Sequence, residues 1–113
     1  MFSMKVRWVK IFSSKDEMLH GLGKRLSMEI RANGKDLVLL KDNESFYLIK
    51  NKCPHQGLSM KDAKCENGKV ICPFHQYRFS LENGRGHGLY LERYPIEYRE
   101  DGVFAGFEYF SIF

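Results

Sequence analysis

Residues 53–75 read "CPHQGLSMKDAKCENGKVICPFH" and hold all three cysteines and two of the four histidines of this 113-residue chain. A Cys-x-His motif opens the stretch and a Cys-x-x-His motif closes it. Thiolates and imidazoles are ligands that zinc and iron accept in proteins. The stretch therefore predicts a metal site with four ligands: Cys53, His55, Cys72 and His75.

Both motifs place a proline directly after the cysteine, Pro54 and Pro73. Strands should end at these positions because proline cannot donate a ladder hydrogen bond. Each motif also follows an apolar, strand-like segment, "SFYLIK" in one case and "GKVI" in the other. We expect a rigid sheet to hold two ligand-bearing loops close together.

The rest of the chain predicts an antiparallel β fold, either a small sandwich or a barrel. Short segments rich in β-branched and aromatic residues alternate with four turn dipeptides of the kind that favours tight hairpins. Only residues 14–23, with Ser14 as N-cap and Gly21 as the stop signal, suit a short helix. The turn dipeptides are Asn33-Gly34, Asn67-Gly68, Asn83-Gly84 and Asp101-Gly102.

Composition limits the classes of protein. A chain of 113 residues with 43% hydrophobic residues suits one domain, 1–113. Charges interrupt every apolar run, which excludes a membrane span, and the N-terminus lacks a signal peptide, so we expect a cytoplasmic protein. The net charge of +4 comes from residues 50–85, with seven basic and three acidic side chains. These charges are dispersed, without a nucleic-acid-binding motif, and suit a solvated face or the guidance of an acidic partner.

The pairing of ligands discriminates between metals. Zinc sites usually group cysteine with cysteine and histidine with histidine, at wider spacing. One cysteine and one histidine in each loop suits a binuclear cluster, in which one iron takes both thiolates and the other takes both imidazoles.

The chain here resembles the Rieske [2Fe–2S] family. "YLIKNKCPHQGLSM" is similar to the family's strand and first cluster loop, and "VICPFHQYRFSLENGRG" to its second loop and the following hairpin. The resemblance implies one [2Fe–2S] cluster per chain, with Cys53 and Cys72 on the buried iron and His55 and His75 on the outer one. It also implies a Rieske-like antiparallel β-sandwich or barrel, with a small cluster-binding subdomain made of two loops at about 50–85.

The details resemble the low-potential, oxygenase-type members. Leu58 and Phe74 stand where the Rieske proteins of respiratory complexes carry a disulfide, and Tyr77 and Phe79 stand where those proteins place a serine and a tyrosine. Residues 84–95, "GRGHGLYLERYP", depart from the family's proline-bearing third loop. Shielding of the cluster by residues 86–95 therefore stays open.

The other chemistry-bearing residues have ordinary interpretations. Cys65 matches no ligand position, and we expect it to pack as a small hydrophobe. His20 and His87 stand alone among charged or glycine neighbours, and we expect surface residues without metal.

These features predict an electron carrier and no catalytic residue. The resemblance implies a ferredoxin that takes one electron from a flavoprotein reductase to a terminal oxygenase. We expect a monomer, with both partners docking near His55 and His75. The chain is too short for a mononuclear-iron oxygenase domain as well. Two alternatives stay open: the small subunit of an assimilatory nitrite reductase, and a structural zinc module for protein binding.

Overall fold

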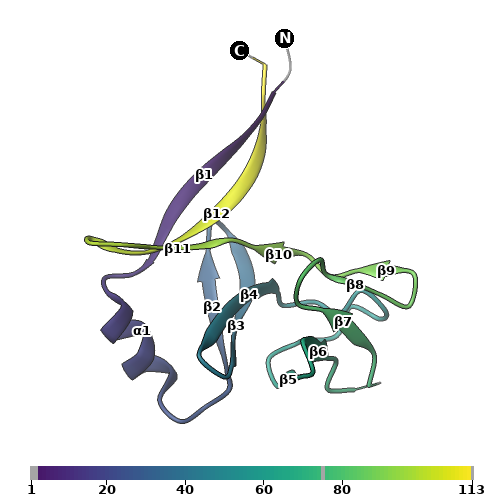
Figure 1. The fold of residues 1–113 in the computed structure, drawn as a ribbon. Helices are drawn as coiled ribbons and strands as arrows, with labels where there is room; N and C mark the ends of the chain where they lie inside the picture. The colour runs from purple at the N-terminus through teal and green to yellow at the C-terminus, as the bar shows by residue number, and fades with distance from the viewer. Residues whose placement is uncertain (1–2, 75, 113) are drawn as a thin grey trace.

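The computed structural model describes residues 3–74 and 76–112, in which strands predominate and a short helix follows the first of them (Figure 1). The helix is α1 (Lys15–Leu22). The strands are β1 (Ser3–Phe12), β2 (Ser27–Ala32), β3 (Lys35–Asp42), β4 (Ser45–Lys50), β5 (Lys64–Glu66), β6 (Lys69–Ile71), β7 (Arg78–Ser80), β8 (Arg85–Gly86), β9 (Leu89–Tyr90), β10 (Arg93–Tyr94), β11 (Ile96–Arg99) and β12 (Gly102–Ser111).

All described strand pairs are antiparallel, as the sequence predicted. A central sheet has the order β10-β4-β3-β2, and a second has the order β1-β12-β11. A small sheet, β5-β6-β7, and the hairpin β8-β9 lie together at one side of the body (Figure 1). The fold is therefore an antiparallel β assembly with a small lobe attached to its central sheet.

The central sheet separates two hydrophobic cores, and β3 contributes to both. Successive side chains of a strand point to opposite faces of the sheet, and the four buried residues of β3 alternate between the two cores in this way. Val38 and Leu40 enter one core together with both cysteine-loop residues Cys53 and Cys72. The other face belongs to a core with Phe12, Met18, Leu37, Leu39, Leu48, Val103, Ala105 and Phe107. Burial on both faces fixes the register of β3, and through β3 and β4 it fixes where the first cysteine loop starts.

The helix α1 begins after the predicted N-cap, Ser14, but it ends later than the sequence predicted. The Ser14 side chain accepts a hydrogen bond of 3.0 Å from the backbone nitrogen of Glu17, so Ser14 is the N-cap. The predicted stop at Gly21 was wrong, because Gly21 lies inside the helix and Gly23, with φ of 61°, ends it. No helix in the described part of the chain is long and apolar enough to cross a membrane.

Two of the four predicted turn dipeptides form the turn between paired strands. Asn33-Gly34 and Asn67-Gly68 have positive φ at both residues, which is the backbone of a type I′ hairpin turn. The prediction at Asp101-Gly102 was one residue too late, because the turn between β11 and β12 is Glu100-Asp101 and Gly102 already belongs to β12, where it pairs with Arg99. The prediction at Asn83-Gly84 was wrong, because this turn leads from β7 into β8, which pairs with β9 instead.

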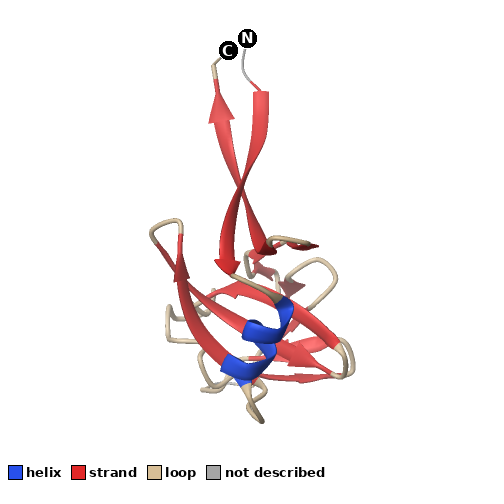
Figure 2. Cartoon of the chain, turned by 90° about the vertical axis from the view of Figure 1, so that its left-hand side faces the viewer, coloured by secondary structure: helices blue, strands red, loops and turns tan. Residues whose placement is uncertain are grey.

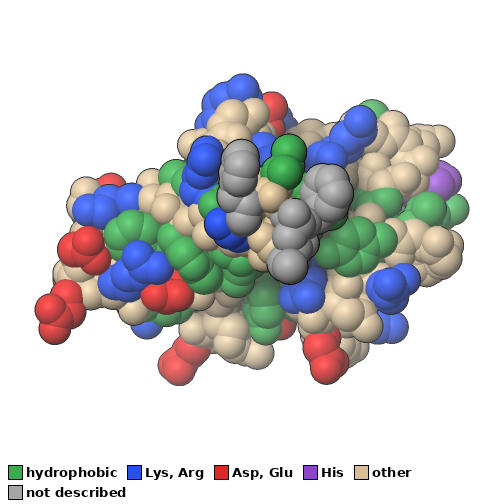
Figure 3. Space-filling view, turned by 90° about the horizontal axis from the view of Figure 1, so that it is seen from above, with side chains coloured by type: hydrophobic (Ala, Val, Ile, Leu, Met, Phe, Trp, Pro, Cys, Tyr) green, Lys and Arg blue, Asp and Glu red, His purple; other side chains and the backbone are tan. Residues whose placement is uncertain are grey.

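The strands β1 and β12 form an arm that projects from the body (Figures 1 and 2). Residues opposite each other in an antiparallel pair share a face, so Met4, Val6, Trp8 and Phe110 line one face of the arm. All four side chains are exposed. Seen from above, hydrophobic side chains lie beside the tip of the arm, with Lys and Arg side chains between them (Figure 3).

Candidate metal centre

The first cysteine loop follows β4 and closes on its own cysteine. The backbone nitrogen of Cys53 donates to the carbonyl of Leu58 (2.7 Å), and the nitrogen of Gly57 donates to the carbonyl of Cys53 (2.7 Å). Gly57 has φ of 74°, so a residue without Cβ suits the bend. The loop is thus a compact unit built around the cysteine.

The second cysteine loop follows β6 and closes in the same way. The nitrogen of Cys72 donates to the carbonyl of Tyr77 (2.8 Å), and the nitrogen of Gln76 donates to the carbonyl of Cys72 (3.2 Å). Gln76 has a positive φ of 58° at the position that Gly57 occupies in the first loop. The two loops, which both begin with Cys-Pro, therefore share one hydrogen-bonding plan, in which each cysteine bonds to the residues four and five positions later.

The two closed loops bring two thiols together in the interior. Cys53 is 1% exposed and Cys72 is 0% exposed, and their side chains lie within hydrogen-bonding reach of each other. Burial raises the pKa of the Cys53 thiol, and the neighbouring Cys72 raises it further, although hydrogen bonds from the backbone of His55 and Gln56 act in the opposite direction. A pair of buried sulfurs facing backbone donors is suited to a cation that replaces the two protons.

His55 is partly buried and lies against an aromatic ring from the other loop. Its imidazole stacks on Tyr77 with 4.0 Å between ring centroids and 29° between planes. Tyr77 in turn stacks on His87 at 4.6 Å. The sequence-based interpretation of His87 as an isolated surface residue missed this contact, although the side chain is exposed as expected.

His75, the fourth predicted ligand, lies outside the described residues. Among residues 3–74 and 76–112, no group of three or more His, Cys, Asp or Glu side chains is arranged to hold a metal ion. The described part of the site is therefore a thiol pair with a separate imidazole beside it. This arrangement fits a binuclear cluster, because its two irons take their thiolates and their imidazoles separately.

The three cysteines are free thiols. Cys65 lies on β5, opposite Val70 of β6, and packs half-buried against the core that contains the other two. Burial, together with the charge of Asp42, raises the pKa of the Cys65 thiol to about 11. It is thus a protonated, packed cysteine, in line with the role that the sequence suggested.

The sequence reasoning missed Asn51, which supports the first cysteine loop. Its Oδ1 accepts hydrogen bonds from the hydroxyl of Ser59 (2.8 Å) and the backbone nitrogen of Met60 (2.7 Å). Its Nδ2 donates to Glu29 on β2 (3.0 Å). Asn51 belongs to no sequence motif. Its place between the end of β4 and Cys53 was the one sequence feature that could have indicated its role in supporting the loop.

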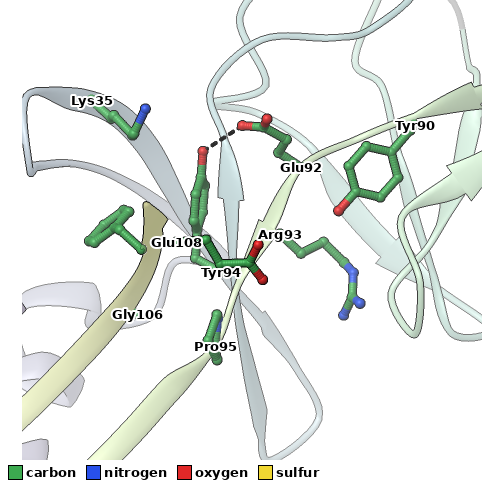
Figure 4. A pocket seen from close by; sticks show the side chains of 9 residues that line it. Lys35, Tyr90, Glu92, Arg93, Tyr94, Pro95, Gly106 and Glu108 are labelled. Carbon is green, nitrogen blue, oxygen red and sulfur yellow. Dashed lines mark hydrogen bonds between the residues drawn. The ribbon is translucent and has the colours of Figure 1, made fainter. Parts of the chain in front are cut away.

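A separate cavity of about 310 Å³ lies at the base of the arm (Figure 4). In it, the hydroxyl of Tyr94 donates to Glu92 (2.8 Å), and burial followed by this carboxylate raises the pKa of Tyr94. Gly106 and Glu108 of β12 close another side of the cavity. No predicted ligand lines it, so it is distinct from the cysteine loops.

Comparisons with known proteins agree with this geometry. The family model described as the Rieske [2Fe-2S] domain matches residues 7–92. The chain is 30% identical over 77 residues to the ferredoxin component of the alkene monooxygenase system of Xanthobacter autotrophicus, covering 65% of this chain and 63% of that protein, slightly under two thirds of its length. It is 31% identical over 84 residues to the ferredoxin component of the naphthalene 1,2-dioxygenase system of Pseudomonas putida, covering 73% and 74%.

Solved structures share the fold. The ferredoxin of carbazole 1,9a-dioxygenase from Nocardioides aromaticivorans IC177 matches with a TM-score of 0.68 at 18% identity, over 87% of this chain and 95% of that one. A putative NADPH nitrite reductase small subunit matches with a TM-score of 0.67 at 18% identity, over 88% and 97%. The family model covers most of the chain and includes both cysteine loops, and the chain belongs to the Rieske [2Fe-2S] domain family.

Proposed function

We propose that this protein is a ferredoxin that carries one electron from a flavoprotein reductase to a terminal oxygenase. Membership of the Rieske family implies one [2Fe–2S] cluster per chain. In the proposal, Cys53 and Cys72 hold one iron, and His55 and His75 hold the other. When bound, the cluster supplies a one-electron redox couple, and the chain acts as an electron carrier rather than an enzyme.

The observation that carries the proposal is the shared closure of the two cysteine loops around adjacent buried thiols. A carrier must change charge by one electron without moving its ligands. Loops locked by two backbone hydrogen bonds each restrict such movement, and the prolines after both cysteines restrict it further. This arrangement supports an electron carrier better than a site that must open for a substrate.

Core residues exclude water from the cysteine side of the site. Met60, Val70 and Phe79 are buried in the same core as the thiols. The site with two thiolates and two neutral imidazoles is formally neutral when oxidised and carries about one negative charge when reduced. Because core residues cover the thiols, a partner can approach the cluster only from the side of the imidazole ligands. In the proposal, the electron enters and leaves on that side.

We place partner docking at the imidazole side, near His55 and His75. Exposed apolar side chains lie near the candidate ligands in the sequence: Leu58 is 36% exposed and Phe74 is 57% exposed. The dispersed basic residues of 50–85 would attract an acidic surface, because charge complementarity mainly increases the rate of encounter. We further propose that the protein works in the cytoplasm, because a reducing compartment keeps its three cysteines as free thiols.

One alternative has a specific observation in its favour. The putative nitrite reductase small subunit matches this fold about as well as the carbazole dioxygenase ferredoxin does. This similarity concerns the fold alone. The chain retains all four candidate ligands, and its relatives of at least 30% identity include oxygenase-system ferredoxins, which favours the carrier.

Metal and sulfide analysis tests the proposal. Protein produced anaerobically with sufficient iron should contain two irons and two acid-labile sulfides per chain, and one electron equivalent of dithionite should bleach its red-brown colour. The reduced protein should then pass its electron to an acceptor oxygenase in a stopped-flow experiment. Colourless protein with one zinc and no sulfide would instead support the structural zinc module.

A further inference from the structure

The hairpin β8-β9 presents a histidine in an unusual backbone conformation. Its two-residue turn is His87-Gly88, with φ of 56° and 74°. Positive φ at both positions is the type I′ geometry, for which Asn-Gly is the favoured pair. Histidine adopts this conformation less readily than asparagine or glycine, so the turn itself does not call for an imidazole.

The hairpin is tightly fixed against β7. A Cβ at Gly86 would lie 2.0 Å from the carbonyl oxygen of Arg78, so only glycine permits this approach. The backbone nitrogen of Arg78 donates to Nε2 of His87 (3.2 Å). These two contacts fix both the backbone and the ring of His87.

The ring of His87 completes a stack of three. Tyr77 lies 4.0 Å from His55 and 4.6 Å from His87, centroid to centroid, with 29° between planes in each case. Two rings at such distances cannot share one face of Tyr77, so the tyrosine is held between them. The rings of Phe79 and His87 meet edge to face, with 6.3 Å between their centroids and 76° between their planes.

We propose that His87 is a positioning residue that holds Tyr77 against His55 and thereby sets the reduction potential of the cluster. The inference rests on the proposed function, because it assumes that His55 is a cluster ligand. In this proposal, residues 86–88 shield the cluster from water, as the family's proline-bearing loop would otherwise do.

The direction of the effect follows from charge and solvation. The backbone carbonyl of Tyr77 accepts the hydrogen bond of the Cys72 nitrogen, so Tyr77 is part of the closed second cysteine loop. If His87 is removed, Tyr77 loses its outer support and water reaches the face of the His55 ring. Water stabilises the more charged state, which is the reduced one, so the reduction potential should rise.

Four variants distinguish the effect of the His87 ring from the effect of the turn that carries it. His87→Asn keeps a residue that accepts positive φ and removes the ring. His87→Phe keeps an aromatic ring and removes the acceptor nitrogen. Tyr77→Leu removes the middle of the stack and installs the side chain that Leu58 has at the matching place in the first loop. His20→Asn, on α1, is a matched control on another element.

Film voltammetry and the EPR g-values of the reduced cluster are the readouts, with thermal unfolding measured alongside. We expect an upward shift in potential and altered g-values for His87→Asn and Tyr77→Leu, substantial recovery in His87→Phe, and no change in His20→Asn. The inference is overturned if His87→Asn folds, binds its cluster and leaves both readouts unchanged, or if His87→Phe shifts them as much as His87→Asn. A wild-type protein without any cluster would refute the proposed function instead.

Discussion

The side-chain oxygen Oδ1 of Asn51 lies 2.7 Å from the backbone nitrogen of Met60. The contact spans the first cysteine loop from its start to its end, and the hydroxyl of Ser59 shares the same oxygen. One uncharged side chain thus ties the loop that carries Cys53 to the end of β4.

Replacing Asn51 with Ala should therefore loosen the cluster. It leaves the amide of Met60 without its acceptor, at a cost of about 1–3 kcal/mol. The rate at which a chelator bleaches the holoprotein should rise. Ser59→Ala removes one of the two bonds to Oδ1 and should have a smaller effect, whereas equal effects of the two variants would show that the Met60 contact contributes little.

Substitution of the cysteines should separate ligands from packing. Cys53→Ser and Cys72→Ser should each abolish the visible spectrum, because a lost thiolate leaves one iron poorly held. Cys65→Ser should keep the spectrum and the two irons per chain. A colourless Cys65→Ser protein that is still folded would require a different ligand assignment.

Cys65 should react slowly with alkylating reagents until the pH is high. Its pKa is raised to about 11 from an ordinary 9.0, first by burial and then by Asp42. The folded protein thus holds this proton more tightly than the unfolded chain does. The resulting stability is complete below about pH 9 and is lost as the pH rises through about 11.

The rate of iodoacetamide labelling of Cys65 in the holoprotein, followed by mass spectrometry, checks this prediction. It should increase with pH up to about 11 in the folded protein and level off near 9 in urea. A folded-state midpoint near 9 would mean that the thiol is more exposed to water than its packing indicates.

Glycine at position 86 should not tolerate a side chain. Gly86→Ala places a Cβ against the backbone of Arg78, and relieving that contact should cost roughly 1–3 kcal/mol or more. Gly21→Ala is the matched control, since its new Cβ would meet only Met28, at 3.8 Å, inside a helix. That control should be neutral or stabilising by about 0.5–1 kcal/mol. Thermal unfolding of the holoproteins compares the two.

The reduction potential should lie near the low end of the roughly −150 to +300 mV span of Rieske centres. No disulfide joins the three cysteines, which are all free, and Phe79 offers no hydroxyl to the cluster. Fewer hydrogen bonds to the sulfurs leave the reduced state less stabilised. A potential in the upper half of the span, measured by film voltammetry, would argue against delivery of electrons to an oxygenase.

Local patterns predicted the strands and the helix start well. β-branched and aromatic runs marked most long strands, and Ser14 was recognised as a cap because capping depends on neighbours within one turn. Gly21 was mistaken for the stop because glycine is tolerated inside a helix that buries Met18 and Leu22. Packing against the core extended the helix past the local signal.

The sequence indicated the candidate site where its signal is contiguous, and gave no indication of the contacts that join distant segments. The spacing of Cys53 and Cys72 pointed to two loops, and the structure brings their thiols together. The support from Asn51 and the stack on Tyr77 could not be predicted, because each joins segments that only the folded chain makes adjacent. The hairpin turn at His87-Gly88 was missed because histidine is an uncommon first residue for it.

The arm has a practical consequence for attaching the protein to other materials. Ser3 and Ser111 are paired at its far end, and the lobe with β5-β6-β7 lies elsewhere on the body (Figure 1). A linker joined to either strand would leave the molecule along the arm. On an electrode or in a fusion, the lobe with β5-β6-β7 would then lie away from the support, on the body beyond the base of the arm.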